Sequence, residues 1–146
     1  MKTSQRGFTL IELMITVIVA AILASLAIPA YRDYVVRSHR VDAKNALLAL
    51  ATAQEKFFLQ CNRYAAALGA ANSCAGTGTV AFGTTSERGW YDLTVTATDV
   101  DFTVTATARA SGSQFSDQVC RSFQVTGLGT HTARNASNGD STATCW

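Results

Sequence analysis

The start of the chain is dominated by one long apolar run. Residues 13–31 carry no formal charge and follow directly after Glu12. Because a helix rises by about 1.5 Å per residue, this stretch nearly matches the ~30 Å hydrocarbon core of a bilayer. We therefore expect a transmembrane helix over residues 8–30. A secretory signal peptide would end in a small-x-small cleavage site before the folded part, and none is obvious at Ala24–Ala30.

A second helical pattern continues the first. From Tyr31 to about Gln60 the residues are strong helix formers, and the apolar ones fall near a 3-4 spacing. These apolar residues are Val36, Ala43, Ala46, Leu50, Ala53 and Phe57. The opposite face carries Arg37, Arg40, Lys44 and Glu55, which we interpret as a solvated surface. Pro29 removes a backbone donor, so a kink is expected near residues 25–30. Together the two patterns predict about fifty helical residues, roughly 75 Å long.

Beyond the helix the pattern changes to that of an antiparallel sheet. Residues Cys61–Arg88 are rich in Ala, Gly, Thr and Ser and are expected to form a loop region. Two runs with period-two alternation follow at 91–97 and 102–108, and a third covers Cys120–Thr126. Thr98–Asp101 predicts a hairpin turn, whereas the tail Gly127–Trp146 reads as irregular. We therefore expect an α+β fold in which Ala43–Phe57 covers three or four strands.

Composition and charge place the chain relative to the membrane. With 48% apolar and 15% charged residues, it suits a protein partly solvated by lipid or by copies of itself. Lys2 and Arg6 account for the net charge of +2, and their place before the apolar run predicts a cytoplasmic N-terminus. From Cys61 onward five arginines stand against six acidic residues, so no polyanionic partner is demanded by these numbers.

Four cysteines, Cys61, Cys74, Cys120 and Cys145, lie beyond the apolar run. An even number in an oxidising compartment indicates disulfides, and three pairings are formally possible. Short local loops favour Cys61–Cys74 and Cys120–Cys145, each contributing roughly 3 kcal/mol in the chain-entropy model. No C-x-x-C pair occurs, and the two histidines are far from ligand spacing, so we expect neither a metal nor another cofactor.

A short polar stretch with two basic residues precedes the apolar run. It reads KTSQRG followed by FTLIEL, so that Glu12 comes five residues after Gly7. This motif resembles the processing signal of type IV pilins and related pseudopilins. The resemblance implies cleavage by a prepilin peptidase between Gly7 and Phe8, and N-methylation of Phe8. It also implies that Glu12 neutralises the terminal amine of a neighbouring subunit, because an unpaired acid in a membrane costs a few kcal/mol or more. The alternative is that Glu12 lies at the headgroup depth of an ordinary anchor.

The resemblance extends over the rest of the chain. Pro29 matches a pilin proline that accompanies a segment able to lose helicity when the filament forms; a simple kink without a role in assembly is the alternative. The segments YRDYVVRS from Tyr31, QEKFF from Gln54 and WYDLTV from Trp90, with DQVC from Asp117 and the final Cys145-Trp146, resemble the PilE-type minor pilins, a group related to the DNA-uptake receptor pilin ComP.

The implied architecture is the pilin fold. Residues 1–7 would form a leader, 8–30 a transmembrane and assembly helix, and 31–146 a periplasmic or extracellular globular region that includes the second half of the helix. That region would hold a small antiparallel sheet of three or four strands and a disulfide-bounded C-terminal part.

Three functional hypotheses follow. The first is a structural subunit of a type IV pilus that polymerises with other pilins and serves twitching motility or adhesion. It would be processed by prepilin peptidase, held in the inner membrane, and moved by the pilus assembly machinery into the extracellular filament. Whether it would be a minor or a major pilin stays open. The second is a DNA-binding minor pilin for natural transformation, supported by Arg63, Arg109, Arg121, Arg134 and His131 and opposed by the negative charge beyond Cys61.

The third hypothesis is a type II secretion pseudopilin, which shares the leader and the helix. Major pseudopilins usually carry an acidic calcium loop near the C-terminus, whereas residues 127–146 contain only Asp140 as an acid. No enzyme is expected, because the chain lacks the nucleophile elbow, the H-E-x-x-H motif and the phosphate-binding glycine loop. Asn135-Ala136-Ser137 matches a glycosylation sequon, but a Ser-rich loop would contain the same triplet by chance.

Overall fold

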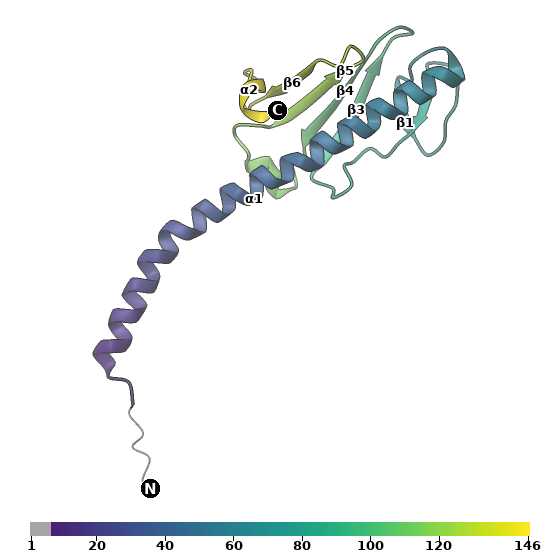
Figure 1. Cartoon of the computed structure of the whole chain (residues 1–146). Coiled ribbons are helices and arrows are strands. Elements are labelled where there is room, and N and C mark those ends of the chain that lie inside the picture. The colour runs from purple at the N-terminus through teal and green to yellow at the C-terminus, as the bar shows by residue number, and fades with distance from the viewer. Residues whose placement is uncertain (1–6) are drawn as a thin grey trace. The chain divides into compact units, whose positions relative to one another are not determined.

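The computed structural model describes residues 7–146. The predicted leader residues 1–6, with Lys2 and Arg6, lie outside this range. The chain divides into two compact units, Met1–Val35 and Val36–Trp146, and we call the second unit the head. Its elements, labelled in part in Figure 1, are α1 (Leu10–Cys61, shared with the first unit), β1 (Ala67–Gly69), β2 (Thr79–Ala81), β3 (Tyr91–Ala97), β4 (Phe102–Ala108), the 3-10 helix η1 (Ser113–Ser116), β5 (Ser122–Thr126), β6 (His131–Arg134) and α2 (Thr142–Cys145).

Helix α1 confirms the predicted long helix. At its start the Glu12 backbone N–H donates to the Thr9 hydroxyl at 3.3 Å, so that Thr9 caps the first turn. The helix continues through Pro29 without a break. At its end Asn62 adopts the left-handed conformation with φ 54° and donates its N–H to the Phe58 carbonyl at 2.8 Å. Asparagine tolerates this conformation better than most residues, which explains why the helix stops here.

The head contains a four-stranded antiparallel sheet in the order β3-β4-β5-β6. The predicted turn between β3 and β4 is present, with the Thr98 N–H donating to the Asp101 carbonyl at 2.8 Å. Strand β6 and helix α2 correct the expectation that residues 127–146 are irregular. Both elements have only four residues, too few to show a clear period in sequence. Gly129, with φ 75°, lies in the turn that leads into β6.

The segment between the helix and the sheet is more ordered than predicted. Within the expected loop region β1 and β2 form a short parallel pair. The chain leading into it is fixed by Gln54, whose fully buried amide donates to the Ala65 carbonyl and accepts from the Ala65 N–H, both at 2.9 Å. A glutamine on a helix is normally read as exposed, so the hydrophobic pattern gave no sign of this contact.

Helix α1 packs on the inner face of the four-stranded sheet (Figure 1). The buried helix residues are Ala43, Ala46, Leu47, Leu50, Gln54 and Phe57. Four of them belong to the predicted apolar stripe, while Val36 and Ala53 are half-buried. The sheet contributes alternate residues, among them Tyr91, Leu93, Phe102, Val104, Phe123 and Val125. Arg40 was expected on the solvated face of the helix, and this expectation is wrong, because its guanidinium pairs with the buried carboxylate of Asp117.

Two disulfides join Cys61 to Cys74 and Cys120 to Cys145. These are the pairs that the loop lengths favoured. Their surroundings differ, because Cys120 and Cys145 are buried in the core whereas Cys74 is exposed. Among residues 7–146 no group of three or more His, Cys, Asp or Glu side chains is placed to hold a metal ion.

Candidate functional site

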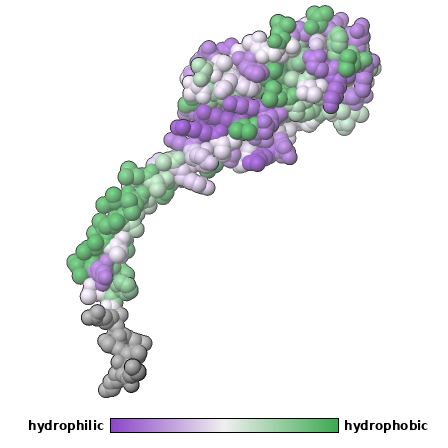
Figure 2. Space-filling model, in the orientation of Figure 1, coloured by the Kyte–Doolittle hydropathy of each residue, from purple (hydrophilic) through white to green (hydrophobic). Residues whose placement is uncertain are grey.

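In the first unit, residues 8–30 present an apolar surface, and their large apolar side chains are exposed. Phe8 is 84% exposed, Leu10 76% and Leu26 70%. Figure 2 shows hydrophobic residues covering most of this unit, and α1 is long and apolar enough to cross a membrane. The hydroxyls of Thr16 and Ser25 donate to helix carbonyls at 2.8 and 2.7 Å, so they need no water. The surface of this segment is therefore suited to lipid or to other apolar helices.

Glu12 is the exception on this surface. Its side chain is exposed, and its carboxylate has no hydrogen bond or ion pair with any other residue in the range 7–146. Gly7 and Phe8 precede the first turn and are also exposed. An unpaired carboxylate is costly in a membrane, so Glu12 gains most from a cation outside the described residues.

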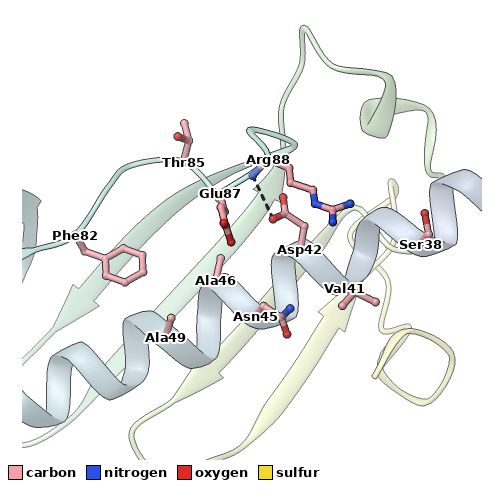
Figure 3. Close-up of a pocket in the computed structure, with 10 residues that line it drawn as sticks. All are labelled: Ser38, Val41, Asp42, Asn45, Ala46, Ala49, Phe82, Thr85, Glu87 and Arg88. Carbon is pink, nitrogen blue, oxygen red and sulfur yellow. Dashed lines mark hydrogen bonds between the residues drawn. The ribbon is translucent and has the colours of Figure 1, made fainter.

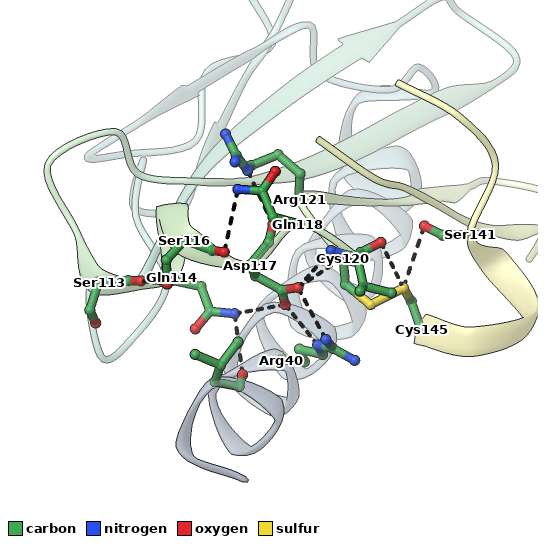
Figure 4. Close-up of polar contacts among 12 residues, drawn as sticks. Arg40, Ser113, Gln114, Ser116, Asp117, Gln118, Cys120, Arg121, Ser141 and Cys145 are labelled. Atoms are coloured by element: carbon green, nitrogen blue, oxygen red, sulfur yellow. Dashed lines mark hydrogen bonds and ion pairs between the residues drawn. A yellow bond between two sulfur atoms is a disulfide. The ribbon is translucent and has the colours of Figure 1, made fainter. Parts of the chain in front are cut away.

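In the head, Asp117 fastens the segment before Cys120 to α1 (Figure 4). Its buried carboxylate accepts two hydrogen bonds from the Arg40 guanidinium, at 2.8 Å from Nε and 3.1 Å from Nη2. It also accepts the N–H groups of Val119 and Cys120, both at 3.0 Å. Breaking a buried pair of this kind leaves an uncompensated charge, so the contact fixes the position of the segment strongly.

Residues 113–121, which we call the 113–121 loop, are fixed at a second point. The Gln114 amide donates to the Val36 carbonyl and to the Asp117 carboxylate, both at 3.2 Å. The outer side of the loop carries Phe115, 43% exposed, and Val119, 45% exposed. The Arg121 guanidinium lies 3.8 Å from the centre of the Phe115 ring. The loop thus presents an apolar surface with a cation stacked on it.

A groove of about 630 Å³ lies between α1 and the segment 82–88 (Figure 3). Its lining residues are Ser38, Val41, Asp42, Asn45, Ala46, Ala49, Phe82, Thr85, Glu87 and Arg88. Asp42 accepts the Arg88 backbone N–H through Oδ1 at 3.3 Å. The other oxygen, Oδ2, is buried and has no hydrogen-bond partner among the described residues. One end of the groove carries two carboxylates, of Asp42 and Glu87, against the single cation of Arg88 and is therefore acidic, whereas Phe82 and the alanines make the other end apolar.

The basic residues of the DNA-binding hypothesis lie on several parts of the head, and of these only His131 and Arg134 share a strand. Arg109 lies 3.1 Å from the Asp92 carboxylate, and Arg63 lies 4.0 Å from that of Asp99. These two arginines are partly neutralised. Arg134 is exposed on β6 and donates to the Asn138 carbonyl at 3.0 Å.

The edge strand β6 brings Lys44 and His131 to Trp146, although these residues lie far apart in the sequence. Trp146 donates its indole N–H to the Thr132 carbonyl at 2.7 Å, which holds the ring against the strand. His131 stacks on this ring with centroids 4.4 Å apart, and the Lys44 amine lies 5.5 Å from the ring centre. We call Lys44, His131 and Trp146 the β6-edge cluster; Arg134 lies on the same strand. The sequence had indicated His131 and Arg134 as candidate DNA-binding residues, but it gave no sign that Trp146 stacks on His131 or that Lys44 lies near the Trp146 ring.

Two polar side chains, those of Asp140 and Asn135, lie next to β6. Asp140 accepts hydrogen bonds from the Thr142 hydroxyl at 2.6 Å and N–H at 2.9 Å, which lower the pKa of that carboxyl. It therefore adds a negative charge near Arg134. The backbones of Asp140 and Arg134 form an isolated antiparallel β-bridge. Asn135 of the sequon accepts the N–H groups of Ser137 and Gly139 at 3.0 and 2.8 Å. Its side chain thus shapes a turn.

Comparison with known proteins finds similarity to type IV pilins and fimbrial proteins. The type IV major pilin protein PilA of Myxococcus xanthus is 52% identical over 59 residues, which cover 40% of this chain and 27% of that protein. The fimbrial protein EcpC of Eikenella corrodens is 56% identical over 45 residues, 31% of this chain and 29% of that protein. The chain thus spans less than a third of the length of these two curated relatives.

A fimbrial protein of Pseudomonas aeruginosa is 49% identical over 57 residues, 39% of this chain and 37% of that protein. Among solved structures, a type IV pilin from Shewanella oneidensis has a TM-score of 0.42 at 19% identity, covering 66% of this chain and 89% of that one.

Two family models match the chain. Residues 2–28 match the prokaryotic N-terminal methylation motif. Residues 29–124 match the family described as "Type IV minor pilin ComP, DNA uptake sequence receptor". The second match covers well over half of the sequence and includes β1 to β4, the 113–121 loop and the first part of β5. The chain therefore belongs to the type IV minor pilin ComP family, within the type IV pilins.

Proposed function

We propose that this chain, once processed, is a non-catalytic structural subunit of a type IV pilus. Cleavage between Gly7 and Phe8 by a prepilin peptidase, followed by methylation of Phe8, would give the mature N-terminus. The protein would then stay in the inner membrane until the assembly machinery transfers it into the extracellular filament. The observation that carries this proposal is the exposed apolar surface of residues 8–30, which contains one acid, Glu12, without a partner among the described residues.

The physical reason for assembly is that both features are satisfied by another subunit. The apolar side chains of the first unit can exchange lipid contacts for contacts with neighbouring helices. Glu12 can meet the terminal amine of a neighbouring Phe8, which lowers the cost of a charge in a medium of low dielectric constant. Because Glu12 lies four residues along the chain from Phe8, this contact also selects one register between subunits.

Replacement of Glu12 tests the proposal. In Glu12→Ala cells we expect the amount of this chain in sheared filaments to fall by about tenfold or more, since docking loses an interaction of a few kcal/mol. Its amount in membranes should stay the same. Glu55→Ala is the matched control, because Glu55 is an exposed carboxylate of the same helix within the head. Normal incorporation of Glu12→Ala would remove the electrostatic part of the proposal.

Processing can be measured directly. Mass spectrometry of the native protein should find an N-terminus at Phe8 that carries one methyl group. An intact Met1, or an end generated elsewhere, would favour a simple membrane-tethered domain and contradict polymerisation.

A second candidate function is DNA binding during uptake. The matched family is described as a DNA uptake sequence receptor. The β6-edge cluster supports this function, because cations beside an aromatic ring suit contact with phosphates and bases. Asp140 and the paired arginines oppose it, since nonspecific affinity depends on clustered positive charge.

Gel shifts with duplex DNA and the full chain in detergent micelles test the second candidate. Lys44→Ala and Arg134→Ala should each weaken binding and lower the slope of log K against log salt concentration by about 1. Arg109→Ala is the control, because Arg109 is already paired with Asp92. Absence of binding, or equal effects of the three substitutions, would reject a DNA site at the β6 edge.

A further inference from the structure

We propose that the groove between α1 and the segment 82–88 receives the 113–121 loop of a second copy of this chain. This inference rests on the proposed role as a filament subunit and assigns to it a contact between heads. The groove and the loop share no residue, and each is formed wholly within the head.

The groove has unused binding capacity at its acidic end. Asp42 keeps a buried carboxylate oxygen without a hydrogen-bond partner among residues 7–146. Glu87 lines the same groove and forms no ion pair with another described residue. Figure 3 shows both side chains between the helix and the 82–88 segment, with Arg88 beside Asp42. A buried acceptor without a partner favours an incoming donor, above all a charged one.

The rest of the groove offers an apolar wall. Val41 is 53% exposed, Ala49 is exposed and Phe82 is half-buried. In Figure 3 the Phe82 ring points toward the helix side of the groove. The complementary ligand should therefore combine a cation with a medium-sized apolar or aromatic side chain.

The 113–121 loop has this combination. Phe115 and Val119 are exposed, and Arg121 stacks on Phe115. Asp117 and Gln114 hold the loop on α1, so it is ordered before it meets a partner. Ordering in advance lowers the entropy cost of association. Arg121 would face Asp42 and Glu87, while Phe115 and Val119 would pack against Val41 and Phe82.

The two surfaces are different patches of the same head. A contact between unlike patches is heterologous, and its repetition produces an open helical array unless the rotation closes a ring. The contact thus has the symmetry that a filament requires.

Photo-crosslinking in the bacterium tests the contact with the full chain. A benzophenone amino acid replaces Val41, and illuminated cells are separated into membranes and sheared filaments. We expect a dimer of this chain in which the crosslink maps to residues 113–121. The same amino acid in place of Leu128, which is 88% exposed on the β5–β6 turn, is the control and should give no such dimer.

Reversal of charges separates a direct contact from damage to the fold. Glu87→Arg and Arg121→Glu alone should each lower the crosslinked dimer by about fivefold, and the two together should restore it to within about twofold. Arg134→Glu, an exposed charge reversal outside the loop, should leave the dimer unchanged. A crosslink to another pilin or outside residues 113–121, no dimer, or no rescue by the double reversal would overturn the proposal.

The same experiment distinguishes the two proposals. If the chain is present in filaments but the crosslink fails, only the contact between heads is rejected. If the chain is absent from filaments and the mapped dimer still forms in membranes, the filament role is rejected and the contact remains.

Discussion

Helix α1 contains two regions of similar helical sequence that use their apolar residues in opposite ways. In the part of α1 before Val35 the large apolar side chains are exposed. After Val36 the apolar residues occupy one stripe and are buried under the sheet. Residues 13–31 of the first region carry no formal charge, whereas the second region carries charged residues on the side away from the core.

The two regions obtain their stability from different sources. The head is complete within one chain, because Phe57, Leu50 and Leu47 are fully buried by the strands. The first region has no such burial among the described residues, so its apolar surface is suited to lipid or to other apolar helices. Substitutions in the two regions should therefore separate folding of the head from the proposed assembly of a filament.

The largest effect on folding is expected at Phe57. Its ring is fully buried against the sheet, so Phe57→Ala should lower the free energy of unfolding of the head by about 4 kcal/mol through lost burial and a cavity. Urea unfolding of the full chain in detergent micelles, followed by the fluorescence of Trp90 and Trp146, measures this change.

The matched substitution in the first region is Ile18→Ala. Ile18 is exposed, so the free energy of unfolding of the head should change by less than about 0.5 kcal/mol. A similar loss for Phe57→Ala and Ile18→Ala would contradict the division of α1 into two roles.

The buried disulfide comes next in size. Replacing both Cys120 and Cys145 by serine should cost about 3.5 kcal/mol, because their separation of 25 residues closes the longer loop. Replacing both Cys61 and Cys74 should cost about 3 kcal/mol. The same unfolding assay without reductant compares them, and a larger loss for the exposed pair would show that loop length does not control their contributions.

Asp117→Asn tests the contact between the 113–121 loop and α1. The amide can still accept a backbone N–H, but Arg40 loses its counter-ion, so a loss of roughly 3 kcal/mol is expected. Asp92→Asn is the control, since the Asp92–Arg109 pair is exposed and should change stability by less than about 1 kcal/mol. Equal losses would mean that burial of the ion pair does not matter.

Much of the head could be predicted from the sequence. The helical period predicts α1, alternation predicts β3, β4 and β5, and loop length favours the observed cysteine pairs. Arg40 and Gln54 do not, because a polar residue on a helix is expected to be solvated until a specific buried partner, such as Asp117 or Ala65, is known. Strand β6 is missed since four residues are too short for a reliable alternation.

The candidate surfaces divide in the same way. The motif around Gly7, Phe8 and Glu12 is local, so the sequence contains it entirely. The groove and the β6-edge cluster combine residues far apart in the chain, such as Lys44 with Trp146, and depend on how the sheet lies on the helix. Only the fold reveals them.

Ionisation of Tyr91 is expected to have the smallest effect on the stability of the head at neutral pH and a larger effect in alkali. Burial, and then the nearby Asp117 charge, raise the pKa of Tyr91 above its ordinary value of 10.0. The folded head therefore keeps the phenol proton when the unfolded chain has lost it. Stability is complete below about pH 10 and falls by about 1.4 kcal/mol per pH unit as the pH rises above that value.

Tyr91→Phe should flatten this decline, because the unfolded chain no longer gains from ionising that group. Unfolding of the full chain in micelles between about pH 9 and about pH 11 gives the slope, which should be shallower than in the parent by about one proton's contribution near pH 11. Tyr31→Phe is the control, since Tyr31 is exposed on the first region of α1 and should leave the slope unchanged. If both substitutions gave the parent's slope, ionisation of a tyrosine buried under the second region of α1 would not be what limits the head in alkali.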